Sequence, residues 1–306
     1  MRIVFLGTPE FAVPSLSALS EKYEVAGVIT QPDREKDRKG RLIKGAVALT
    51  AESKGLPVFQ FEKIKTEGAD ALRALHPDIM VTCAYGQILS KEILDIPRLG
   101  VLNVHGSLLP LYRGSAPIQR ALMNGDKETG ITIMKTDVGM DSGDILSQEK
   151  TLIDSDDYVE DLYAKLSVIG ARLLLDTIDG YASGKIKPVP QNAECATYAP
   201  MLKKEEAYID FSASCEQVRN VIRGMGYGVC LLGGTPLKIF RADLRESCGR
   251  PGEILVAAKD EFVVACGTGA LAITDVQASG KKRMKTADFL NGMRISAGEF
   301  LARVKD

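Results

Sequence analysis

The stretch Gly100-Val-Leu-Asn-Val-His-Gly-Ser-Leu-Leu-Pro110 decides the fold and points to the site. Its apolar start, at residues 101–102, is typical of a buried parallel strand, and the pattern then turns polar at Asn103 and His105 before a glycine breaks it. Alternate residues of a strand point to the same side, so this amide and this imidazole should lie next to each other. Ligands of open α/β sheets bind beyond the carboxyl ends of the strands, and we expect a site there.

The imidazole of His105 is the better of two candidates for a base at neutral pH. The chain has only two histidines, and His76 precedes Pro77 in a polar junction that we expect at the surface. An Asn-x-His sequence at a strand end can equally satisfy the backbone groups of a turn. On this stretch alone, that alternative stays open.

A second stretch, Asp137-Val-Gly-Met-Asp-Ser-Gly-Asp144, is acidic, contains glycine and follows another strand-like run. It lacks the length and the ligand spacing of a calcium-binding loop. A carboxylate brought near the imidazole would fix its tautomer and raise its basicity. An asparagine, a histidine and an aspartate would then form a complete set for acid-base chemistry.

The composition limits the class of protein. A chain of 306 residues, 45% hydrophobic and 26% charged, is long enough for two globular domains. No apolar stretch approaches the roughly 20 residues that cross a bilayer, and the start shows no signal-peptide pattern, so we expect a cytoplasmic protein. Six scattered cysteines predict neither disulfides nor a structural metal. The net charge of −1 does not indicate a nucleic-acid binder, although a local basic patch can bind nucleic acid even when the net charge is near zero.

The order of the expected elements predicts the architecture. Strands alternating with helices over residues 1–181 favour an α/β fold, with a doubly wound, mostly parallel sheet. Its first turn, Gly7-Thr-Pro-Glu10, lacks the Gly-x-Gly-x-x-Gly fingerprint, so we reject a nicotinamide cofactor. Residues 182–206 are rich in proline and polar residues and predict a linker. Short, regularly spaced strands over residues 207–306 predict a small β-barrel.

At these positions the chain resembles the formyltransferases that use 10-formyltetrahydrofolate. The resemblance rests on Asn103-x-His-Gly-Ser-Leu-Leu-Pro-x-Tyr-Arg-Gly-x-Ala-Pro117, with Asp141-x-Gly-Asp144 downstream. Three further motifs also match: Phe5-Leu-Gly-Thr-Pro-Glu-Phe-Ala12, Thr30-Gln-Pro-Asp-Arg34 and Thr197-Tyr-Ala-Pro200. The resemblance spans nearly the whole chain, and within this superfamily it is greatest to the methionyl-tRNA formyltransferase family.

The resemblance implies a Rossmann-like formyltransferase domain followed by an OB-like β-barrel that binds tRNA. It implies transfer of a formyl group from 10-formyltetrahydrofolate to the α-amine of methionyl-initiator tRNA, by a monomer, without a metal and without a covalent enzyme intermediate. The implied catalytic residues are Asn103, His105 and Asp141. Asn103 and His105 would stabilise the oxyanion, and Asp141 would orient the imidazole and assist proton transfer.

Two binding sets are also implied by the resemblance. The folate pocket would be formed by Tyr85, Gly86, Gln87, Ile88, Leu89, Ser107, Leu108, Leu109 and Pro110. The tRNA contacts would be Arg34, Arg38, Lys39, Arg41, Lys281, Lys282 and Arg283, although either basic stretch could be an ordinary solvated surface. The chain departs from the family pattern at Glu35-Lys-Asp37 and at Gly224-Met-Gly-Tyr-Gly228, where the family usually has a tryptophan.

Two other functions stay open. One is a related enzyme that formylates a glycinamide nucleotide or an amino sugar. The other is a folate-dependent RNA-binding module that keeps the pocket and does not turn over.

Overall fold

The computed structural model describes residues 1–34, 40 and 42–304, which form two compact units. Unit 1 consists of Met1–Pro117, Glu128–Leu152 and Tyr163–Pro200, and unit 2 consists of Ile118–Lys127, Ile153–Leu162 and Met201–Asp306. Two short segments, residues 118–127 and 153–162, are therefore part of the unit built mainly from the last third of the chain. None of the described helices is both long and apolar enough to span a bilayer.

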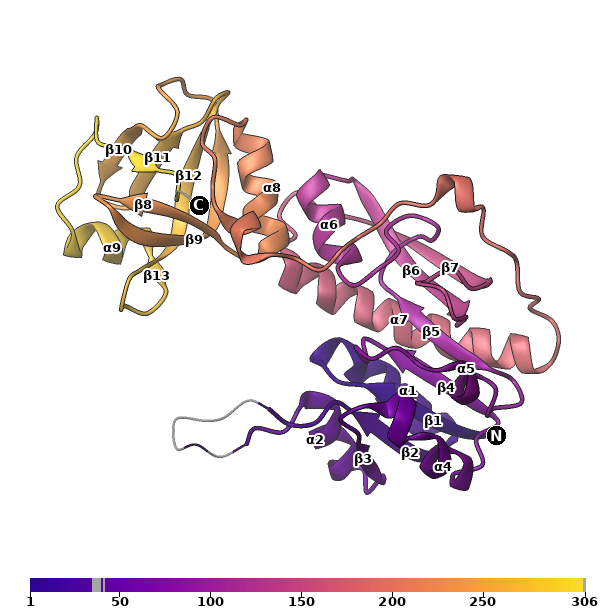
Figure 1. Ribbon diagram of the computed structural model, residues 1–306. Coiled ribbons are helices and arrows are strands. Elements are labelled where there is room, and N and C mark those ends of the chain that lie inside the picture. Colours follow the sequence, from indigo (N-terminus) through magenta and orange to yellow (C-terminus); the bar gives the residue numbers. More distant parts are fainter. Residues whose placement is uncertain (35–39, 41, 305–306) are drawn as a thin grey trace. The chain divides into compact units, whose positions relative to one another are not determined.

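A seven-stranded sheet in the order β3-β2-β1-β4-β5-β6-β7 forms the centre of unit 1 (Figure 1). The parallel strands are β1 (Arg2–Gly7), β2 (Glu24–Thr30), β3 (Val58–Gln60), β4 (Ile79–Cys83) and β5 (Val101–His105). The remaining two, β6 (Glu128–Lys135) and β7 (Ile145–Leu152), pair antiparallel. The predicted α/β fold with a mostly parallel sheet is confirmed. The strand order reverses between β1 and β4, which is where open sheets of this type bind ligands.

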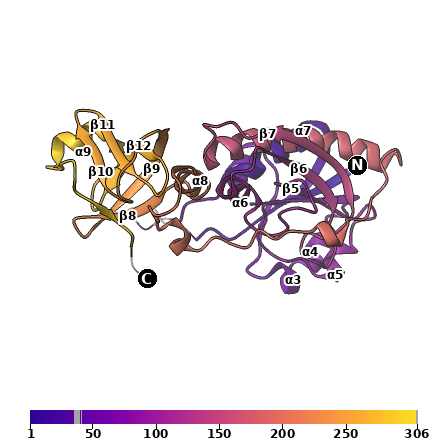
Figure 2. The same ribbon diagram turned by 90° about the horizontal axis from the view of Figure 1, so that it is seen from above.

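Helices cover both faces of this sheet. Alternate strand residues, such as Val4 and Leu6, face one buried cluster with α3 (Ile64–Glu67), α4 (Ala69–Ala74) and α5 (Lys91–Leu94). The other face carries η1 (Glu10–Ala12), α1 (Val13–Lys22), α2 (Ala46–Ser53) and most of α7 (Val159–Ala182). In Figures 1 and 2, α7 runs beside β5 and β6. Gly170 permits this close approach, because a Cβ there would lie 2.9 Å from Val104 Cγ1.

Unit 2 is built on a curled antiparallel sheet in the order β10-β11-β12-β9-β8-β14, with β13 paired to β12. Figure 2 shows the strands β8 to β12 of this sheet. Its strands are β8 (Gly228–Leu232), β9 (Thr235–Arg245), β10 (Ile254–Ala258), β11 (Glu261–Ala265), β12 (Ala270–Ala278), β13 (Met284–Lys285) and β14 (Leu301–Ala302). Its helical elements include part of α6 (Pro117–Asn124), η3 (Lys204–Ala207), α8 (Cys215–Met225) and α9 (Thr286–Gly292). A large buried cluster, which includes the neighbouring rings of Phe262 and Phe289, joins the sheet to α8 and α9.

The sequence of α8 explains where the helix lies. A capping box between Ser214 and Gln217 begins the helix, and left-handed Gly226 ends it. One face carries apolar residues into the core, and another carries Arg219 and Arg223, both buried. Their guanidinium groups donate to backbone carbonyls of residues 154, 155, 157 and 242. Burial, followed by the charge of Arg219, lowers the pKa of Arg223. These bonds attach α8 to residues 153–162 within unit 2.

Phe262→Ala should lower the free energy of unfolding by about 3–5 kcal/mol, because it removes a fully buried ring that contacts Phe289. Phe300→Ala is the matched control: that ring is 39% exposed, so its removal should cost much less. Urea denaturation followed by circular dichroism measures both losses. Equal losses would contradict the central place of Phe262 in the core.

Candidate active site

Asn103 and His105 lie on β5, two residues apart, and so project to the same side of the sheet. Asn103 Oδ1 accepts a hydrogen bond of 3.0 Å from Thr82 Oγ1 on the neighbouring strand. This bond orients the amide, and the Nδ2 group has no partner among the described residues. The asparagine therefore presents an N–H donor at the carboxyl end of the sheet.

The buried ring of His105 is oriented by a backbone carbonyl. His105 Nε2 lies 3.0 Å from the carbonyl oxygen of Tyr112, and because a carbonyl only accepts, Nε2 carries the proton. The second ring nitrogen, Nδ1, lies 3.8 Å from Asp141 Oδ2, which is longer than a hydrogen bond. The partner that fixes the tautomer is thus Tyr112, and the carboxylate faces the nitrogen on the other side of the ring.

The carboxylate of Asp141 reaches this position on a tightly built loop. Its Oδ2 accepts 2.8 Å from the backbone N–H of Gly114, and Asp141 itself has a left-handed backbone with φ of +47°. Tyr112 is also left-handed, with φ of +61°. Non-glycine residues rarely adopt this conformation, and such strain concentrates at functional sites. A Cβ at Gly143 would lie 1.8 Å from the carbonyl oxygen of Lys135, so only glycine fits there.

The residues expected to bind folate lie in two segments. Residues 85–89 follow β4, where Tyr85 and Leu89 are buried and Ile88 is 80% exposed. The side chain of Gln87 is used internally, because its amide donates to Gln31 and Phe61 and accepts from Ile64. Of this segment, Ile88 is the exposed apolar side chain that a ligand could meet.

The second expected folate segment, residues 107–110, is held by polar side chains of β6 and β7. Ser107 Oγ donates to the carbonyl of Leu111, and the backbone N–H of Leu109 donates to Thr132 Oγ1. Gln148 Nε2 donates both to Leu109 and to Thr132. Sequence reasoning missed Thr132 and Gln148, since their alternating positions in β6 and β7 resemble those of any strand.

Gln31 was also missed as a positioning residue, although it belongs to the quoted motif at residues 30–34. Its Nε2 donates 3.1 Å to the carbonyl of Tyr85, and its backbone N–H donates to Thr8 Oγ1. These bonds join the ends of β1, β2 and β4. A connected polar network therefore lies at the carboxyl ends of the strands where the strand order reverses.

The basic residues expected to contact tRNA differ in their exposure and in whether they already form ion pairs. Arg34 pairs with Glu62 at 2.8 Å on the surface, and Arg38, Lys39 and Arg41 lie outside the described residues. Lys281 and Lys282 are exposed in the turn between β12 and β13.

Arg283 differs from its two neighbours, because it stacks 4.6 Å from the ring of Phe240 and lies 3.5 Å from Asp275. Burial opposes ionisation of Asp275, yet Lys285 and Arg283 hold its pKa below the ordinary value. The charge of Arg283 is thus partly balanced by this carboxylate, and Lys281 and Lys282 are the more available cations. At the departure in residues 224–228, Tyr227 supplies an aromatic ring that contacts Phe240 and lies under Lys238 Nζ.

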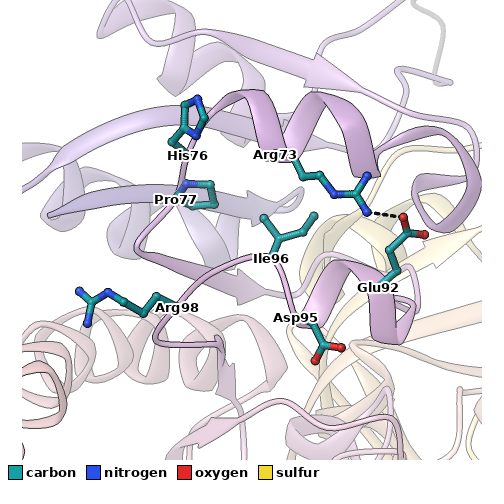
Figure 3. Close-up of a pocket in the computed structure, with 7 residues that line it drawn as sticks. All are labelled: Arg73, His76, Pro77, Glu92, Asp95, Ile96 and Arg98. Carbon is teal, nitrogen blue, oxygen red and sulfur yellow. Dashed lines mark hydrogen bonds and ion pairs between the residues drawn. The ribbon is translucent and has the colours of Figure 1, made fainter.

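A surface hollow of about 700 Å³ lies at the opposite edge of the sheet in unit 1, before the amino ends of β4 and β5 (Figure 3). It is lined by Arg73, His76, Pro77, Glu92, Asp95, Ile96 and Arg98. Arg73 and Glu92 of this lining form an ion pair with each other, whereas Asp95 and Arg98 pair with residues outside the lining, Lys91 and Asp78. His76 lies at this surface, as expected, away from Asn103 and His105. Within the described residues, no group of three His, Cys, Asp or Glu side chains could hold a metal ion.

Comparison with family models and curated proteins identifies the chain's relatives. The model described as formyl transferase matches residues 1–178, and the model for the formyl transferase C-terminal domain matches residues 201–294. The methionyl-tRNA formyltransferase of Citrifermentans bemidjiense is 44% identical over 99% of this chain and 97% of its own length. That of Myxococcus xanthus is 42% identical over 97% of this chain and 96% of its own.

Solved structures support the same fold at lower identity. The sugar 3-N-formyltransferase WlaRD, crystallised with dTDP and 5-N-formyl-THF, has a TM-score of 0.68 at 20% identity, covering 92% of this chain and 99% of its own. HypX from Aquifex aeolicus, in complex with tetrahydrofolic acid, has a TM-score of 0.66 at 17% identity, covering 95% and 47%. From the matched family models and the near full-length relatives, the chain belongs to the methionyl-tRNA formyltransferase family.

Proposed function

We propose that the protein transfers the formyl group of 10-formyltetrahydrofolate to the α-amine of methionine on initiator tRNA. The observation that carries the proposal is the arrangement of Asn103, His105 and Asp141 in a chain of this family, with the carboxylate 3.8 Å from the imidazole. The formyl carbon is already activated by its bond to the folate nitrogen. The chemistry therefore needs a stabilised oxyanion and a route for one proton.

The reaction that fits this geometry is a direct displacement. The uncharged methionyl amine attacks the formyl carbon, forming a C–N bond and a tetrahedral centre with a negative oxygen. The Nδ2 group of Asn103, which Thr82 orients, would donate to that oxygen. Loss of such a donor typically lowers the rate by about 10²–10³. The bond from carbon to N10 then breaks, and the carbonyl forms again on the methionyl nitrogen.

The proton lost by the attacking amine has to reach the leaving folate nitrogen. In our proposal His105 Nδ1 relays it, directly or through a water, because Nε2 is engaged by the carbonyl of Tyr112. Asp141 faces the same Nδ1 and stabilises the imidazolium that forms transiently. The proton returns from Nδ1 to N10 as the C–N bond breaks, so His105 ends in its starting state.

The folate donor would occupy the crevice at the reversal of strand order, beside residues 85–89 and 107–110. Two solved relatives of the same fold were crystallised with folates, which supports this choice of donor. The side chain of Ile88, which is 80% exposed, would cover an apolar part of the ligand. Backbone groups of both segments would hydrogen-bond its heteroaromatic ring.

The tRNA would meet the basic residues at 34–41 and at 281–283. Among the described cations of unit 2, the exposed ammonium groups of Lys281 and Lys282 are best placed to neutralise the phosphates of the tRNA backbone. We also propose that the chain is divided into a catalytic domain at residues 1–181, a linker at residues 182–206 and a tRNA-binding domain at residues 207–306. In this proposal the protein is a monomer and acts in the cytoplasm, where charged tRNA is made.

We also propose that the carboxy-terminal sheet closes into an OB-like barrel. Support comes from hydrogen bonds between its two edges. The backbone N–H of Leu301 donates to the carbonyl of Gly252, and that of Ile254 donates to Glu299. These bonds connect the segment entering β10 with the segment entering β14.

A direct assay tests the proposed function. Purified protein is mixed with radiolabelled 10-formyltetrahydrofolate and, in parallel, with methionyl-initiator tRNA, methionyl-elongator tRNA, glycinamide ribonucleotide or an amino-sugar nucleotide. We expect many turnovers with the initiator tRNA alone. Turnover with the nucleotide or sugar would support a related enzyme instead, and binding without turnover would support a folate-dependent RNA-binding module.

Asp141→Asn should lower single-turnover transfer by roughly 10²-fold or more, because a neutral amide no longer stabilises the imidazolium. Binding of the folate, followed by fluorescence titration, should be unchanged. Asp137→Asn, in the same loop with an exposed side chain, serves as the control and should react like the wild type. A normal rate for Asp141→Asn would remove this carboxylate from the mechanism.

Replacing Lys281 and Lys282 together by alanine should weaken binding of initiator tRNA and reduce the slope of log affinity against log salt by roughly one for each lysine. The folate KM should not change. Lys185 and Lys187 are likewise exposed, and their double replacement by alanine is the control. Filter binding over a series of salt concentrations measures the slopes. An unchanged slope would exclude this turn from the tRNA interface.

A further inference from the structure

Gln191 lies in the segment between the two halves of the chain, and its side-chain amide is fully used. Its Oε1 accepts from Arg113 Nε at 3.0 Å and from Arg113 Nη2 at 2.8 Å. Its Nε2 donates to the backbone carbonyls of Asp141 at 2.9 Å and Gly143 at 2.8 Å. An amide has two acceptor lone pairs and two N–H donors, so every site on this group is occupied. One side chain thereby joins two loops.

The first of these loops is fixed around Arg113, which is only 7% exposed. Its backbone N–H donates to the carbonyl of Thr197, and its carbonyl accepts from Ala199. The residues on either side contact the catalytic set directly. The carbonyl of Tyr112 faces His105 Nε2, and the N–H of Gly114 donates to Asp141 Oδ2.

The second loop, which carries Asp141, is held by Gln191 at two of its backbone carbonyls. Asp141 has a left-handed backbone, and its carbonyl and that of Gly143 both depend on Gln191 for the hydrogen bonds described above. A non-glycine residue held in that conformation is strained, and the surrounding contacts have to offset the strain. The two N–H donors of Gln191 are such contacts.

We propose that Gln191 is a positioning residue that sets the separation between the carboxylate of Asp141 and the imidazole of His105. It binds the loop that orients the ring to the loop that carries the carboxylate, and it does so without touching either reacting group. This inference rests on the proposed role of Asp141 in formyl transfer. It adds to the catalytic set a residue 50 positions away from Asp141 in the chain.

The substitution Gln191→Glu distinguishes the hydrogen bonds to Arg113 from the hydrogen bonds to the carbonyls of Asp141 and Gly143. The glutamate keeps the size and the acceptor for Arg113, but it loses both donors and places a carboxylate opposite two carbonyl oxygens. We expect kcat for formyl transfer to fall by roughly 10²-fold, as for a catalytic group displaced by about 1 Å. The folate KM should stay near the wild-type value, and a cooperative thermal unfolding transition should show that the variant is folded. If Gln191 merely anchored the segment to Arg113, this variant would react normally, and normal kcat would overturn the proposal.

A double-mutant cycle tests whether Gln191 acts through Asp141. Gln191→Ala and Asp141→Asn are measured singly and together by single-turnover transfer. If the glutamine works by placing the carboxylate, the double variant should be no slower than Asp141→Asn alone. Multiplied losses would overturn the proposal. Asn192→Ala, which removes a cap on η2 (Ala193–Cys195) beside Gln191 and leaves the Asp141 loop intact, is the matched control and should keep the wild-type rate.

The cycle also separates this proposal from the proposed function. A normal rate in Asp141→Asn would show that the carboxylate has no catalytic role, and it would overturn both. A slow Asp141→Asn with multiplied losses would leave the proposed mechanism standing and would reject Gln191 alone.

Discussion

The hydrogen bond that holds the imidazole of His105 by one of its nitrogens is the constraint on which the geometry of the candidate site depends. A backbone carbonyl lies 3.0 Å from one nitrogen, and a carboxylate lies 3.8 Å from the other. Neither contact comes from β5 itself. The carbonyl of Tyr112 belongs to the loop that follows β5, the carboxylate of Asp141 belongs to the loop that follows β6, and both residues have left-handed backbone conformations. The sheet thus carries the imidazole, and the loops carry the carbonyl and the carboxylate that face its two nitrogens.

Much of this architecture could be predicted from local patterns. Apolar runs that end in Asn103 and His105 predicted a buried parallel strand with a polar end, and β5 has that form. The acidic, glycine-containing stretch at residues 137–144 predicted a carboxylate near the ring, and Asp141 Oδ2 lies 3.8 Å from Nδ1 of His105. These features were accessible because strand period, turn residues and motif spacing are properties of short stretches.

Other features depend on contacts between distant residues and leave little trace in a local pattern. Residues 182–206 have the composition of a linker, yet Val189 exchanges hydrogen bonds with Ile145, and Thr197 with the loop at residues 110–113. Single pairings of this kind produce no periodicity. The direction of β6 was also inaccessible, because parallel and antiparallel strands are equally apolar when both faces are buried. The same holds for Gln191, whose proposed role rests on four side-chain hydrogen bonds to three residues distant in the chain.

The bonds from Arg219 and Arg223 to residues 154–157 have a consequence for the nascent chain. Residues 118–127 and 153–162 leave the ribosome long before α8, and yet they belong to the unit that α8 completes. During translation, Tyr158 and the residues beside it would stay exposed to solvent until the last third of the polypeptide, which buries Tyr158 in the folded protein, leaves the ribosome. A product terminated near residue 200 would carry permanently the apolar surface that full-length chains expose only briefly, and chaperones or proteases would be expected to act on it.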